Sequence, residues 1–132
     1  TITLPNGRTI QPEEVVGPPR PGRKIVYTGD TRASKDVIKL AEGADFLIHE
    51  ATFDDEMSER AWKDGHSTPS QAAEAAKEAG VKRLILTHIS ARYGTPKPLL
   101  EQARKIFPHV EATEDFMKID LPFAEMEEQG NV

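Results

Sequence analysis

Three short, continuous apolar runs constrain the fold of this chain more than any other feature of its sequence. They occupy residues 25–27, 46–48 and 84–86, and segments with a helical spacing of apolar residues separate them. Continuous apolar runs of this length are typical of strands that helices cover. Strands that alternate with helices indicate an α/β layer. We therefore predict an α/β fold.

The helical segments carry recognisable start and stop signals. Apolar residues recur with helical spacing over residues 34–42, and Gly43 would end that helix. A later helix begins at Thr68, which can cap it, while Pro69 fits the first helical position and Gln71 completes a capping box. We also expect a short helix within residues 52–62, a helix that begins at Thr95-Pro96, and a strand over residues 116–121 with one wet face.

The first 24 residues differ from the rest, because half of the ten prolines lie there. Asn6-Gly7, between two short apolar stretches, is a signal for a hairpin with a two-residue turn. The run Pro18-Pro19-Arg20-Pro21-Gly22 can be neither helix nor inner strand, so it predicts an extended connector. With 132 residues in all, we expect a hairpin and connector over residues 1–24, one domain over 25–122 and an acidic tail over 123–132.

Composition excludes several kinds of site. The chain has no cysteine, so disulfides, thiolate zinc sites and a cysteine nucleophile are excluded, and a reducing compartment such as the cytoplasm fits. Any metal must be held by His, Asp or Glu. No segment has the apolar length of a membrane span or the pattern of a signal peptide. The net charge of −5 lacks the basic excess that is typical of a nucleic-acid binder.

Polar residues follow each apolar run. Asp30 follows the first run, His49 and Glu50 the second, and His88 the third, while His66 directly precedes the best-capped helix. Ligands of open α/β sheets bind outside the carboxyl ends of the strands, so these side chains should meet at one edge. Each also has a simpler interpretation: Asp30 as a helix cap, His49 and His88 as core histidines, and His66 as a surface residue. Taken together they favour a metal site of histidine and carboxylate.

Four longer motifs, in this order, add a resemblance: Tyr27-Thr-Gly-Asp30-Thr31, Leu47-Ile-His49-Glu50-Ala51-Thr52-Phe53, Gly65-His66-Ser67-Thr68 and Leu86-Thr-His88-Ile-Ser90-Ala-Arg92-Tyr93. Over residues 2–122 the chain resembles the C-terminal half of the ribonuclease Z family, the tRNA 3′-processing endonucleases of the metallo-β-lactamase superfamily. Gly-Asp-Thr is shared widely in the superfamily. The His-Glu-Ala-Thr, His-Ser-Thr and Thr-His-x-Ser-x-Arg-Tyr motifs are far more specific.

The resemblance implies an αββα sandwich with two metal ions, usually zinc, at one edge of its sheets. It implies that Asp30 bridges both ions and that His88 ligates one of them. His66 would lie beside the scissile phosphate as a proton donor to the leaving group, and Glu50 would orient His66 or the metal shell. Other divalent metals could serve in place of zinc.

The chain departs from the family in one large respect. The His-x-His-x-Asp-His run of the family, a further histidine ligand and the arm that grips tRNA are absent. We therefore expect the chain to be part of an enzyme, inactive alone, that removes the 3′ trailer from precursor tRNA by phosphodiester hydrolysis. Its expected partners are precursor tRNA, the missing N-terminal half and a second copy, with no membrane.

Two other functions stay open. The chain could be a non-catalytic module that binds a metal or a phosphate, with Asp30 and Thr87 in a receiver-like role. That interpretation lacks the acidic cluster that would hold magnesium, and it leaves His66 and His88 without a task. Alternatively, the chain could belong to another hydrolase of the same superfamily, such as an arylsulfatase-like enzyme or a different phosphodiesterase.

Overall fold

We analysed a computed structural model, which describes residues 1–122. By contacts the chain divides into two units, with residues 1–22 in one and residues 23–121 in the other. The domain limits expected from the sequence, at residues 1–24, 25–122 and 123–132, stay predictions. The expected acidic tail, residues 123–132, lies outside the described residues.

The first unit contains the hairpin that Asn6-Gly7 predicted. Strands β1 (Ile2–Thr3) and β2 (Thr9–Ile10) pair antiparallel. The loop has three residues instead of two, because the N–H of Leu4 donates to the carbonyl of Arg8 (2.8 Å). Gly7 has a φ of +84°, which glycine adopts without steric cost. A short helix that the sequence did not predict, α1 (Pro12–Val15), follows the hairpin.

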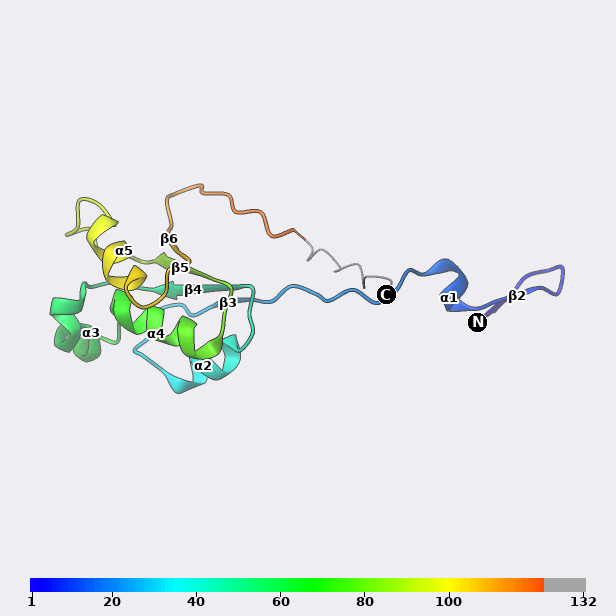
Figure 1. Ribbon diagram of the computed structural model, residues 1–132, viewed down its shortest axis with the longest axis horizontal. Coiled ribbons are helices and arrows are strands. Elements are labelled where there is room, and N and C mark those ends of the chain that lie inside the picture. Colours follow the sequence, from blue (N-terminus) through cyan, green and yellow to red (C-terminus); the bar gives the residue numbers. More distant parts are fainter. Residues whose placement is uncertain (123–132) are drawn as a thin grey trace, which may run out of the picture. The chain divides into compact units, whose positions relative to one another are not determined.

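The second unit is a four-stranded parallel sheet with helices between its strands (Figure 1). The strands lie in chain order, β3-β4-β5-β6. They are β3 (Ile25–Tyr27), β4 (Phe46–Glu50), β5 (Arg83–Thr87) and β6 (Val110–Ala112). The helices are α2 (Lys35–Ala41), η1 (Asp55–Met57), α3 (Ser58–Asp64), α4 (Pro69–Ala79) and α5 (Lys97–Arg104). This arrangement confirms the predicted α/β class.

Helix α4 begins where its capping residues predicted, and α2 lies within the expected residues 34–42, whereas the short helix expected within residues 52–62 is formed by η1 and α3 and extends to Asp64. The Ser34 side chain accepts a hydrogen bond from the N–H of Asp36 at the start of α2. At α4, Thr68 and Gln71 form the full capping box, and Gly80 ends the helix with a φ of +68°. These bonds satisfy backbone groups that a helix end otherwise leaves without partners. The precise start of α4 matters because His66 lies two residues before its cap, Thr68.

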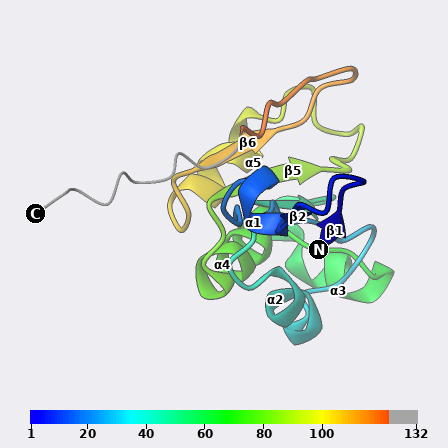
Figure 2. The same cartoon turned by 90° about the vertical axis from the view of Figure 1, so that its right-hand side faces the viewer.

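One face of the sheet packs against the helices and forms the core. Leu47, Leu84 and Leu86 are fully buried there among the alanines of α4. Alanine side chains are small, so α4 can approach the sheet closely. Figures 1 and 2 show α2 and α4 along the same side of the strands. Among residues 1–122, no helix is long and apolar enough to cross a membrane.

The opposite side of the sheet, called here the open face, carries Ile25, Tyr27, Phe46, Ile48 and Ile85. Residues 113–121 extend on this side, away from α2 and α4 (orange in Figures 1 and 2). Together with four of the open-face residues they line a cavity of about 330 Å³. Ile25 and Tyr27 remain 55% and 67% exposed, so the segment covers only part of the open face.

The sequence interpretation was wrong about two features of this side. No strand forms over residues 116–121; the fourth strand is β6, which pairs with β5 and is only three residues long. A turn with φ +63° at Phe116 redirects the chain beyond it. The apolar runs also make Val26, Leu47, Ile85 and Leu86 candidates for the uncovered face; Ile85 lies there, but the other three pack against the helices. Because side chains alternate along a strand, an error of one residue exchanges the two faces.

Candidate metal centre

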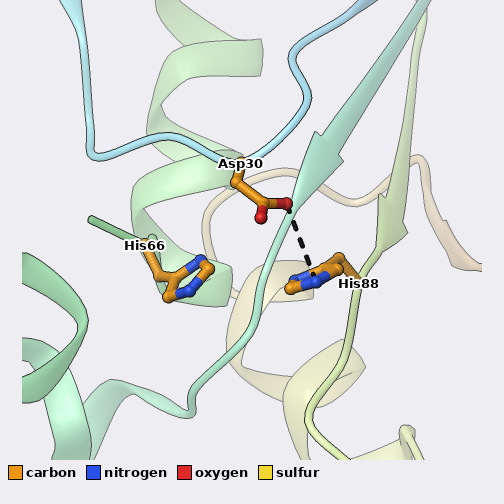
Figure 3. Close-up of side chains that lie close together, drawn as sticks. All are labelled: Asp30, His66 and His88. Carbon is orange, nitrogen blue, oxygen red and sulfur yellow. Dashed lines mark ion pairs between the residues drawn. The ribbon is translucent and has the colours of Figure 1, made fainter. Parts of the chain in front are cut away.

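Three side chains that are distant in sequence meet at the carboxyl edge of the sheet. Asp30 follows β3, His88 follows β5, and His66 lies in the loop between α3 and α4. One ligand atom from each lies within 4.8 Å of the others. Nε2 of His88 is 3.7 Å from Oδ1 of Asp30, the contact drawn in Figure 3. The strand ends and the capped helix thus place the residues as the sequence pattern indicated, whereas the chemical roles of these residues stay predictions.

The backbone at His88 is unusual. Its φ is +54°, a conformation that costs a non-glycine residue roughly 1–3 kcal/mol. The chain turns sharply here at the end of β5, and the N–H of Ser90 donates to the carbonyl of Thr52 (3.0 Å). Strained backbone that surrounding bonds hold in place is a frequent property of functional sites.

Glu50 lies beneath this cluster, fully buried at the end of β4. Its Oε1 accepts hydrogen bonds from the N–H of Thr31 (3.1 Å) and from Nδ1 of His66 (2.8 Å). Its Oε2 accepts from the N–H and the hydroxyl of Thr52 (3.0 and 2.8 Å). A buried carboxylate is tolerated only when hydrogen bonds replace its water. Glu50 therefore ties the Asp30 loop to the His66 loop.

The two histidine rings of the cluster lie almost parallel. Their centroids are 5.4 Å apart with an interplanar angle of 22°, and Phe53 meets the ring of His66 edge-on at 5.9 Å. The side chains of Asp30 and His88 are about half exposed, at 57% and 50%, whereas that of His66 is 19% exposed. A ligand can therefore reach the cluster from solvent.

The donor set fits a borderline metal such as zinc. A carboxylate and an imidazole are ligands that Zn²⁺ prefers, and a catalytic zinc usually takes three protein ligands and a water, so Asp30 and His88 alone would be one ligand short. Within residues 1–122 this is the one group of histidine and acidic side chains close enough to hold an ion. A receiver-like magnesium site would need several carboxylates, and this group has one. The hydroxyl of Thr87 instead accepts a hydrogen bond from Thr113 (3.3 Å).

The remaining histidines lie outside the cluster. The side chain of His49 is buried on the helix-covered side of β4, and its Nδ1 donates to the carbonyl of Glu50 (2.8 Å). This matches the expectation of a neutral core histidine. His109 is exposed. Arg92 and Tyr93 pack across the loop: the guanidinium of Arg92 lies 5.1 Å from the centre of the Phe53 ring, and the Tyr93 hydroxyl accepts from the N–H of Asp54 (2.7 Å).

The buried position of His49 predicts an acid-sensitive fold. Burial lowers the pKa of His49 below its usual 6.5. Below pH 6.5 the His49 imidazole therefore binds a proton in the unfolded chain but not in the folded chain. The free energy of unfolding then falls as the pH falls, by up to about 1.4 kcal/mol per pH unit. We expect urea unfolding midpoints to drop between pH 7.5 and pH 5.5, and to drop less in His49→Asn. His109→Asn is the control; an equal loss of pH dependence in both variants would refute the assignment.

Sequence reasoning missed the central position of Thr52. Its hydroxyl lies within hydrogen-bond distance of Glu50, His66 and His88. The sequence contained one signal, since Thr52 stands two residues after Glu50 at the end of a strand run. Which groups surround a hydroxyl depends on the loop from β5, which no local pattern places.

The fold that carries this cluster has counterparts among known proteins. Residues 14–89, more than half of the chain, match the family model described as a beta-lactamase superfamily domain, so the chain belongs to that superfamily. A crystal structure of the metallo-beta-lactamase fold protein YhfI from Bacillus subtilis superposes with a TM-score of 0.63, at 32% identity, covering 68% of this chain and 36% of that one.

Within the superfamily, several similar curated proteins are named Ribonuclease Z. The Archaeoglobus fulgidus protein is 52% identical over 120 residues, which are 90% of this chain and 39% of that protein. The Haloferax volcanii protein is 47% identical, covering 98% of this chain and 41% of that one. The short form of human tRNase Z superposes with a TM-score of 0.62 at 43% identity, over 77% of this chain and 35% of that one. The chain therefore spans about 40% of the length of the curated relatives it matches.

Proposed function

We propose that this chain forms part of a metal-dependent endoribonuclease that removes the 3′ trailer from precursor tRNA. One observation carries the proposal: Asp30, His66 and His88 meet above a fully hydrogen-bonded Glu50. The residues of this cluster are those that the ribonuclease Z motifs contain. The identity of about 50% to proteins named Ribonuclease Z supports the same substrate.

In the proposed mechanism, Asp30 and His88 would hold metal in the complete centre, with zinc as the proposed metal. Bound metal would supply an activated water and stabilise charge on the phosphate. With a proton on each ring nitrogen, His66 donates the one on Nε2 to the leaving oxygen as the phosphorus–oxygen bond breaks and the oxygen of water bonds to phosphorus. Glu50 accepts the Nδ1–H of His66 (2.8 Å), which holds the ring and leaves Nε2 free for this transfer. The ligands that this chain lacks come from an N-terminal portion of the enzyme.

The proposal extends to the setting of the enzyme. Partners are precursor tRNA, the N-terminal portion and a second copy of the chain, which gives a homodimer. The absence of cysteine fits the reducing cytoplasm, where we place the protein.

Zinc affinity is the first test of an incomplete site. A catalytic zinc needs at least three protein ligands, and in our assignment Asp30 and His88 supply only two. Calorimetry on the isolated chain should give a dissociation constant of roughly micromolar or weaker. Asp30→Asn should weaken binding further, and Glu111→Gln, which changes an acidic residue of β6 outside the cluster, should not. Sub-micromolar zinc binding by the isolated chain would show that it builds a complete shell.

Substrate choice separates the related hydrolases. The chain completed with an N-terminal portion and loaded with zinc should cleave precursor tRNA, and it should leave an aryl sulfate and a β-lactam intact. Preferred turnover of the aryl sulfate would assign the chain to another branch of the superfamily. Metal binding without hydrolysis of any of the three would favour the regulatory module.

A further inference from the structure

Thr52 occupies the centre of the hydrogen-bond network below the cluster. It is only 7% exposed and follows β4 by two residues. Its Oγ1 lies 2.8 Å from Oε2 of Glu50, 2.8 Å from Nδ1 of His88 and 3.2 Å from Nδ1 of His66. The Thr52 N–H also donates to Glu50 (3.0 Å). Thr52 therefore contacts both histidines of the cluster without belonging to it.

The directions of these bonds follow from counting protons. A threonine hydroxyl has a single proton, and an ionised carboxylate can only accept. The hydroxyl proton of Thr52 therefore goes to Glu50, and its oxygen must accept from its other close neighbour, Nδ1 of His88. His88 then carries its proton on Nδ1, which leaves the lone pair on Nε2, the nitrogen 3.7 Å from Asp30.

We propose that Thr52 is a positioning residue that fixes the Nδ1–H tautomer of His88 and thereby directs the lone pair of Nε2 to the metal. The inference rests on the proposed metal centre and adds to it the group that orients a ligand. Metal-binding histidines usually donate their second N–H to a carboxylate, a carbonyl or water. Here the Thr52 hydroxyl accepts that proton and is itself held by Glu50 (2.8 Å).

The same count applies to His66. Its Nδ1 is 2.8 Å from Glu50 and farther, 3.2 Å, from Thr52, so its proton goes to the carboxylate. Both rings then present Nε2 outward, in keeping with their nearly parallel planes. Loss of the Thr52 hydroxyl should therefore disturb His88 more than His66.

Nitrogen-15 NMR of the full chain, without metal and at a pH where the rings are neutral, tests the tautomer directly. We expect His88 to show a protonated Nδ1 and an unprotonated Nε2. In Thr52→Val, which keeps the shape and removes the hydroxyl, the proton should shift towards Nε2. Thr52→Ser should restore the wild-type signals. Thr113→Val, which removes a hydroxyl bonded to Thr87 at the same edge of the sheet, is the matched control.

Metal affinity provides the second readout. In the complete protein, Thr52→Val should weaken zinc binding by roughly 10–100-fold, the usual effect of losing a group that orients a ligand, and Thr52→Ser should recover it. A wild-type spectrum with His88 protonated on Nε2 would overturn the proposal even if Thr52→Val fails to fold. An unchanged tautomer in a folded Thr52→Val would also overturn it.

The two proposals can fail separately. If the complete protein does not cleave precursor tRNA, the tautomer of His88 is still measurable in the chain alone. If cleavage occurs and Thr52→Val leaves both the tautomer and the metal affinity unchanged, only the role of Thr52 is lost.

Discussion

Asp30→Ala should abolish cleavage of precursor tRNA by the completed enzyme and lower its zinc content in the same preparation. The reason is the position of the carboxylate: it is the sole acidic member of the cluster, it is 57% exposed, and it lies 3.7 Å from Nε2 of His88. In the proposed centre this carboxylate would hold metal, so its loss should remove the metal and the activity together. Metal analysis and trailer release measured on one sample provide the check.

His66→Ala provides the contrast. We place His66 outside the ligand set, so this variant should retain nearly all its zinc while cleavage slows by roughly 10²–10⁴-fold, the usual contribution of a general acid. His109→Ala, at an exposed histidine far from the cluster in sequence, should change neither property. His66 lies within 4.8 Å of the other two donors, so a metal role is geometrically available to it. If His66→Ala strips the zinc, His66 is a ligand and the division of roles is wrong.

Association through the open face is the second large effect that we expect. Ile25 and Tyr27 are 55% and 67% exposed, and Phe116 in the covering segment is 99% exposed. Burying one such side chain fully is worth roughly 1.5–3 kcal/mol, against a total stability of about 5–15 kcal/mol for a typical domain. The chain should therefore pair with the N-terminal portion or, when alone, with itself. Sedimentation at low micromolar concentration should show species larger than a monomer.

A pair of charge substitutions locates the surface responsible. Tyr27→Asp on the open face should shift the isolated chain towards monomer. Leu40→Asp, at a similarly exposed apolar residue of α2, should not, because Leu40 lies in a helix that packs against the other face. A wild-type chain that sediments as a sharp monomer and unfolds cooperatively would show that residues 113–121 cover the open face well enough for a self-sufficient domain.

Local patterns predicted the parts of this fold that local physics determines. The runs ending near Asp30, Glu50 and His88 became three parallel strands, and parallel strands bring their carboxyl ends to one edge. Thr68 capped α4 because a side-chain oxygen, a proline and a glutamine stood at the right spacing. These patterns depend only on residues that are close in sequence. For this reason the convergence of the cluster residues could be predicted.

Other features depend on partners far along the chain. The apolar alternation over residues 116–121 suggested a strand, but the edge beside β5 is taken by β6, with Leu84 opposite Val110. Which side of each strand the helices cover was likewise not encoded in runs that are apolar at every position. The role of Thr52 depends on a contact 36 residues away, with His88. Tertiary contacts decided all three.

Reconstitution of cleavage tests the central claim most directly: that this chain supplies one side of the metal centre of a tRNA 3′-processing endonuclease. The part of the Archaeoglobus fulgidus Ribonuclease Z that this chain does not cover can be joined to it, since the two are 52% identical where they overlap. With zinc, the joined protein should release the 3′ trailer from a precursor tRNA, while each part alone and the joined Asp30→Ala variant should not. A correctly folded, zinc-loaded joined protein that leaves the trailer in place would contradict the account.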